Sequence, residues 1–106
     1  MRGLFEIMAQ DVLPTVRSMI AKKLLENGFS QQDIANKLGI TQPAISQYKR
    51  GSRGSKTDVL TKPKIVEAVN SMARRIGSGE IDFDQATSEL FDVCKELFQR
   101  GDFVKE

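Results

Sequence analysis

Histidine is absent from this 106-residue chain, and Cys94 is its one cysteine. A single cysteine excludes a disulfide within the chain and leaves too few ligands for a zinc or iron–sulfur site. The lack of histidine removes the commonest general base and the commonest metal ligand. We therefore expect no cofactor, no metal site and no enzymatic activity. A nuclease or recombinase fragment would need clustered acids for metal ions, and the sequence has none near its basic region.

Long apolar runs and strand-like alternation are missing as well. No stretch is long enough to span a bilayer. The N-terminal segment, with Glu6 and Asp11, lacks the apolar core of a secretory signal. We therefore expect a cytoplasmic protein with no membrane contact. Apolar residues instead recur at helical spacing, which predicts a compact all-α domain.

The charge of the chain is unevenly distributed, although the net charge is only +2. Residues 41–64 contain six basic residues and one acidic residue, whereas residues 80–106 contain eight acidic and three basic residues. A basic middle and an acidic end are typical of a protein that presents one face to a polyanion.

Capping signals predict where most helices begin and end. A short helix is expected over residues 5–12, and a second begins at Leu13-Pro14 and ends at Asn27-Gly28. Pro63 begins a later helix that Gly77-Ser78-Gly79 breaks, and Asp82 caps a last helix that Gly101 closes. The apolar positions expected inside these two C-terminal helices are Ile65, Val66, Val69, Met72, Ala73, Ile76, Phe83, Ala86, Leu90, Phe91, Val93, Cys94, Leu97 and Phe98.

The most informative segment is residues 30–51, SQQDIANKLGITQPAISQYKRG. Ser30 and Thr41 are good N-caps for two short helices, and Gly39 lies in the turn between them. Ala35 is small, which lets the second helix cross the first closely. Apolar residues from both helices would lock the pair into one unit, whereas polar residues of the second helix face outward. This is the pattern of a helix-turn-helix.

This segment resembles the helix-turn-helix of phage repressor and Cro-like domains, above all in the Thr-Gln-x-x-Ile-x-Gln run that begins at Thr41. The whole chain is similar to small archaeal regulators of that superfamily. The resemblance implies a transcriptional regulator, with repression as the simplest output. It would bind double-stranded DNA through residues 1–62, with the helix starting near Thr41 in the major groove. Gln31 matches a phosphate-contacting glutamine, and Gln42 and Gln47 match base-reading ones.

The predicted DNA contacts fall into two groups. The base readers are Gln42, Pro43, Ser46 and Gln47; glutamine can pair with adenine through two hydrogen bonds, whereas Pro43 offers apolar contact alone. The phosphate contacts are Gln31, Thr41, Lys49, Arg50, Arg53 and Lys56.

Residues 63–106 are predicted to form a helical pair that builds a homodimer. The last helix is apolar on more than one side, which indicates burial on more than one side. The predicted dimer interface is Phe91, Phe98, Leu90 and Leu97. Two alternatives stay open. Both helices can fold over their own N-terminal region, or the acidic end can bind a partner protein, as in an antitoxin.

Overall fold

The computed structural model describes residues 3–49 and 61–101 of the chain, and within these ranges every regular element is helical. The prediction of an all-α fold is confirmed. None of the helices in this part of the chain has both the length and the apolar content that crossing a membrane requires. The elements in chain order are α1 (Leu4–Ile7), the π-helical turn η1 (Met8–Val12), α2 (Leu13–Glu26), α3 (Gln31–Leu38), α4 (Gln42–Lys49), α5 (Pro63–Ser78) and α6 (Phe83–Gln99).

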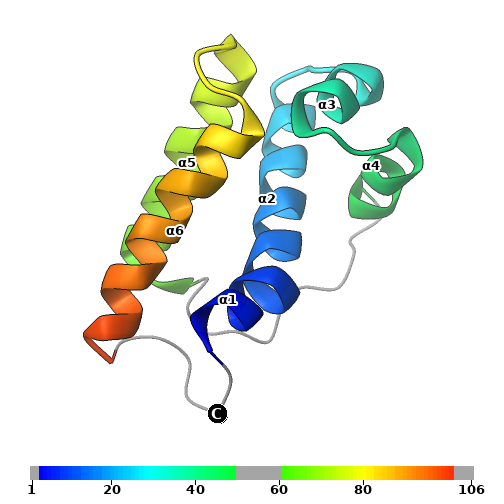
Figure 1. Cartoon of the computed structure of the whole chain (residues 1–106). Helices are drawn as coiled ribbons and strands as arrows, with labels where there is room; N and C mark the ends of the chain where they lie inside the picture. The colour runs from blue at the N-terminus through cyan, green and yellow to red at the C-terminus, as the bar shows by residue number, and fades with distance from the viewer. Residues whose placement is uncertain (1–2, 50–60, 102–106) are drawn as a thin grey trace.

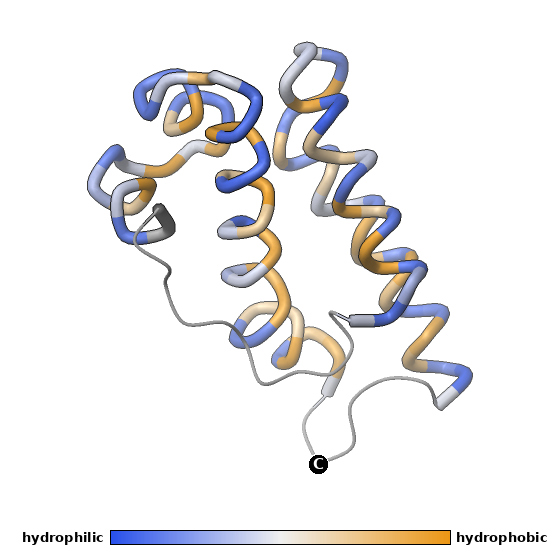
Figure 2. Tube along the Cα trace, turned by 180° about the vertical axis from the view of Figure 1, so that it is seen from behind, coloured by the Kyte–Doolittle hydropathy of each residue, from blue (hydrophilic) through white to orange (hydrophobic). Residues whose placement is uncertain are grey.

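Helix α2 is the centre of the fold. It packs against α3 and α4 on one side and against α5 on the other, and α5 pairs with α6 as a hairpin (Figure 1). Apolar positions of α2 line the side that faces this hairpin (Figure 2). Ile20, Ala21 and Leu24 of α2 are fully buried, and they belong to one hydrophobic cluster to which all the helices contribute.

The N-terminal helices differ from the sequence prediction. The backbone is helical without a break from Leu4 to Glu26, so Leu13-Pro14 does not start a separate helix. Proline inside a helix lacks an N–H donor and crowds the carbonyl four residues before it. The π-helical turn directly before Pro14 widens the backbone there, and such turns are a known way to change the course of a helix without ending it.

Helix α5 also continues further than its sequence indicates. Gly77 and Ser78 are helical, and the helix ends at Gly79, whose φ of 85° is left-handed. A Cβ atom on Gly77 would lie 3.1 Å from a side-chain carbon of Leu24 and 3.3 Å from the ring of Phe29. Gly77 is therefore a contact point, where a missing side chain lets α5 approach the end of α2.

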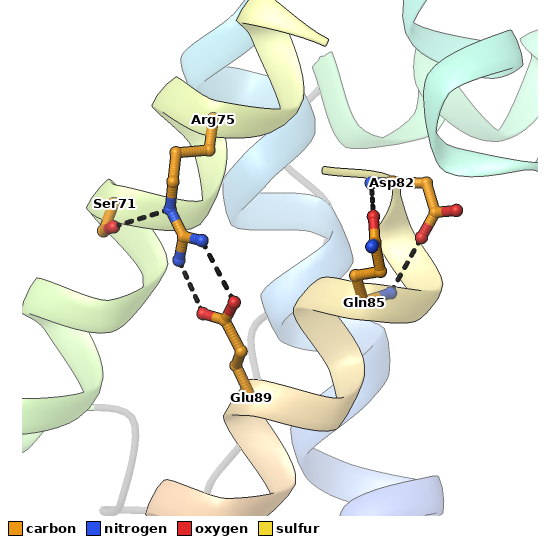
Figure 3. A network of polar contacts seen from close by, with 5 residues as sticks. All are labelled: Ser71, Arg75, Asp82, Gln85 and Glu89. Carbon is orange, nitrogen blue, oxygen red and sulfur yellow. Dashed lines mark hydrogen bonds and ion pairs between the residues drawn. The ribbon is translucent and has the colours of Figure 1, made fainter. Parts of the chain in front are cut away.

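Polar contacts fix the turn between α5 and α6 (Figure 3). Arg75 of α5 forms a two-pronged ion pair with Glu89 of α6, and its Nε donates to Ser71 Oγ at 3.2 Å. The Arg75 guanidinium lowers the pKa of Glu89, and the hydrogen bonds to Glu89 raise the pKa of Arg75.

The start of α6 confirms the predicted cap at Asp82. The Gln85 backbone N–H donates to the Asp82 carboxylate at 2.8 Å, and the Asp82 backbone N–H donates to the Gln85 side chain at 2.9 Å (Figure 3). This reciprocal pair is a capping box, which satisfies two backbone donors at the helix start.

The burial of several apolar side chains in α5 and α6 differs from what their sequence predicts. Val66 is 37% exposed, so it is not part of the core. Leu90 and Leu97, which were predicted at a dimer interface, are buried within the chain itself. Phe91 and Phe98 are only half-buried and pack on the edge of the core. Cys94 is fully buried, and burial raises the pKa of its thiol to about 12.

Candidate nucleic-acid interface

Helix α3 begins and ends as its sequence predicts. The Ser30 hydroxyl oxygen accepts a hydrogen bond from the Asp33 backbone N–H at 3.1 Å, which caps the N-terminus. Gly39 follows the last turn with φ of 67°, a conformation that costs other residues about 1–2 kcal/mol. The Ile40 N–H then donates to the Ala35 carbonyl at 3.0 Å and closes the turn towards α4.

Helix α4 is capped by Thr41, whose Oγ1 accepts from the Ala44 backbone N–H at 3.4 Å. Pro43 lies in the first turn of α4, where backbone N–H groups have no acceptor within the helix, so proline loses no hydrogen bond there. Ile45 is the described residue of α4 that is fully buried, and it lies in the same cluster as Ile34 and Leu38 of α3. An apolar side of each short helix thus holds the pair together.

A polar contact joins the outer sides of the same two helices. The Gln31 side-chain oxygen, at the start of α3, accepts from Gln42 Nε2 at 3.4 Å and from Ser46 Oγ at 3.2 Å. Gln42 and Ser46 are four residues apart and therefore share one face of α4. The sequence predicted that Gln31, Gln42 and Ser46 contact DNA. It did not predict that Gln31 contacts Gln42 and Ser46, which lie 11 and 15 residues further along the chain.

The other predicted base readers lie on the adjacent face of α4. Pro43 and Gln47 are also four residues apart, and both are exposed. Thr41 is exposed and serves as a cap. Four predicted phosphate contacts are outside what the structure describes: the side chain of Lys49, and Arg50, Arg53 and Lys56 entirely. The sequence also predicts a core position for Tyr48 and a helix end at Gly51, and the Tyr48 side chain and Gly51 lie outside the described residues.

The starts of the two helices differ in charge. Asp33 lies in the first turn of α3, whereas the first turn of α4 contains no acidic residue. A helix N-terminus carries partial positive charge on its free N–H groups and favours an anion there, unless a carboxylate already occupies the place. Of the two, the start of α4 is the better position for a phosphate.

Residues 20–62 match a protein family described as Helix-turn-helix. The segment is a helix-turn-helix of the Cro/C1 type. The match spans the second half of α2, all of α3 and α4, and the chain up to the start of α5. No match was found among curated proteins or among solved structures. This match supports a DNA-binding helix-turn-helix regulator, and α4 is the second helix of the helix-turn-helix.

Proposed function

We propose that the chain is a sequence-specific transcriptional regulator that inserts α4 into the major groove of double-stranded DNA. The observation that carries this proposal is the Gln31–Gln42–Ser46 contact on the exposed side of the helix-turn-helix. It supports the proposal because it holds the side chain of Gln42 at the N-terminal end of α4, and the N-terminal residues of the second helix contact base edges in such motifs.

The hydrogen bond to Gln31 leaves Gln42 with the groups that adenine recognition needs. A glutamine amide has two N–H donors and one carbonyl acceptor. One N–H is donated to Gln31, which leaves one donor for adenine N7 and the oxygen to accept from adenine N6. The contact also restricts the rotamers of Gln42 before binding, so less conformational entropy is lost when the base pair is read.

Gln31 can serve a second purpose in the same arrangement. Its oxygen accepts from Gln42 and Ser46, so its own amide N–H groups are left to donate to a phosphate oxygen. Ser46 is half-buried and donates its hydroxyl proton to Gln31, and it therefore contacts bases only as an acceptor. Pro43 and Gln47, on the neighbouring face, extend the reading surface.

A homodimer is part of this proposal, because one short helix reads too few base pairs for selectivity. Two helix-turn-helix units on a duplex contact half-sites about 34–36 Å apart. Occupation of a promoter by such a dimer is the simplest form of repression. An antitoxin-like role for the acidic end has less support, because Phe83, Leu90 and Leu97 of α6 are buried against the chain's own helices.

The Gln42→Ala variant tests the assignment of the reading helix. We expect it to lose about 1–3 kcal/mol of binding to the preferred site, and to relax the choice at one base pair, because the pair of hydrogen bonds to adenine is lost. The preferred site is first selected from random duplexes at a fixed salt concentration, and affinities are then measured by fluorescence anisotropy. Gln99→Ala, at the end of α6, is the matched control and should bind as the parent does. Unchanged base preference in Gln42→Ala would contradict the placement of α4 in the groove.

The basic residues after α4 are tested by the salt dependence of binding. Each phosphate contact contributes about −0.9 to the slope of log affinity against log salt concentration. The double variant Arg53→Ala/Lys56→Ala should flatten this slope by roughly one to two units. The control is Lys64→Ala/Arg100→Ala, since both of these cations lie at Glu96 on the C-terminal hairpin. A slope equally flattened in the control, or unchanged in the test variant, would place the phosphate contacts elsewhere.

A further inference from the structure

The largest exposed aromatic side chain of the described residues lies outside the helix-turn-helix. Phe5 of α1 is 77% exposed, and its ring stacks on Phe91 of α6 with the centroids 5.1 Å apart and the planes at 27°. Helix α1 lies beside α6, at the end of α2 that is remote from α3 (Figure 1). Because the Phe91 ring already restricts the conformations of the Phe5 side chain, a second surface that covers Phe5 loses little additional side-chain entropy.

Phe91 belongs to a stripe along α6 that also contains Asp84, Ser88, Lys95 and Phe98, which we call the Phe91 stripe. At about 100° per residue these positions share one side of the helix. The side that faces the core, with Leu90, Cys94 and Leu97, is a different one. Asp84, Ser88 and Lys95 are exposed, and Phe91 is half-buried.

The charges of the Phe91 stripe are arranged so that the stripe complements itself. Asp84 lies near its beginning and Lys95 lies eleven residues later, about 16 Å along the axis. In the part of the chain that the structure describes, no salt bridge involves either residue. If a second α6 runs antiparallel, Asp84 of each copy meets Lys95 of the other. The same register sets Phe91 against the small Ser88 of the second copy.

We propose that a second copy of this chain docks on the Phe91 stripe, with α6 antiparallel to its counterpart and Phe5 completing the apolar contact from α1. The inference rests on the proposed function, which requires two helix-turn-helix units, and it names the surface that joins them. A two-fold contact presents the same patch from both copies, so every favourable pair in it occurs twice. The patch leaves α4 free for DNA, because α2 lies between α4 and the α5–α6 hairpin (Figure 1).

Charge reversal tests the register directly. Asp84→Lys places two lysines together at both ends of the contact, and Lys95→Asp places two aspartates there. Each single variant should weaken self-association on the order of tenfold in low salt, as two exposed ion pairs become two repulsive pairs. The double variant Asp84→Lys/Lys95→Asp should dimerise as the parent does. Sedimentation equilibrium at micromolar concentration measures all of these constants.

Mixing the two single variants distinguishes contact between copies from contact within one copy. An equimolar mixture of Asp84→Lys and Lys95→Asp forms a heterodimer in which both ends again pair opposite charges, so mixing should restore association. Glu67→Lys, an exposed reversal on α5 with the same change in net charge as Asp84→Lys, should leave association unchanged. Phe5→Ala should weaken association without lowering the thermal midpoint of unfolding measured by circular dichroism, because the ring is mostly exposed.

The outcomes separate this inference from the proposed function. If the parent protein is a monomer, the Phe91 stripe is not a dimer interface. The same conclusion follows if the single variants associate as the parent does, or if mixing them fails to restore association. Anisotropy on a single half-site supplies the second readout, because the single variants should bind a half-site as the parent does and lose affinity only for the paired site. Loss of half-site binding in Gln42→Ala with normal association would concern the reading helix alone. Absence of half-site binding in a parent that dimerises through the stripe would overturn the proposed function and leave the interface standing.

Discussion

Replacement of Ile45 by alanine is expected to lower the free energy of unfolding by about 2–5 kcal/mol. The Ile45 side chain is fully buried and lies in the cluster that joins α4 to α3 and α2. Its removal leaves a cavity beneath α4, and it takes away the apolar anchor that holds the start of this helix in position. Urea unfolding followed by circular dichroism measures the loss, and we expect affinity for DNA to fall with it.

Ile45→Val is the matched control, because it removes one methylene group and should cost only about 0.5–1.5 kcal/mol. A variant with alanine that is as stable as the one with valine would show that α4 is held by contacts other than its buried side chain.

The Ala35→Leu variant is expected to be destabilised by about 1–3 kcal/mol for the opposite reason. Ala35 is 5% exposed and lies among Ile34, Leu38 and Ile45, and its carbonyl accepts the hydrogen bond that closes the turn after α3. A larger side chain has to displace α4 or α2, so the distance between α3 and α4 increases and the Gln31–Gln42 contact is lost. Thermal unfolding and anisotropy with the selected duplex measure both effects.

Asn36→Leu adds an apolar side chain at the next position of α3, which is exposed. It should change stability by no more than about 0.5 kcal/mol, as surface substitutions generally do. Equal stability of the two leucine variants would mean that the space around Ala35 can expand, and that small size is not required there.

The parts of the fold that the sequence predicted correctly depend on nearby residues. Ser30, Thr41 and Asp82 each cap a helix through a backbone N–H three residues later, so the signal and the structure lie within one turn. Gly39 likewise marks a left-handed backbone position whose requirement is local. The helix-turn-helix could be found from residues 30–51 because its caps, turn and apolar positions all agree.

The parts that could not be predicted depend on residues far apart in the sequence. The periodicity of α6 shows that both Leu90 and Phe91 are apolar, but not that α6 buries the first in its own chain and leaves the second beside Phe5. Pro14 has the pattern of a helix start, and only the preceding π-helical turn shows that the helix continues through it. In the candidate site, Gln31 could be assigned to phosphate by resemblance, but its contacts with Gln42 and Ser46 require the crossing of α3 over α4.

The close approach at Gly77 affects how the molecule opens. Because the backbone of α5 at Gly77 lies directly on Leu24 and Phe29, α5 covers these apolar side chains at the end of α2 and in the turn into α3. Partial unfolding of the helix-turn-helix would expose this contact and leave α5 without one side of its packing. We therefore expect the helix-turn-helix and the C-terminal hairpin to form one cooperative unit, in which the amide protons of α2 and α5 exchange in the same opening event.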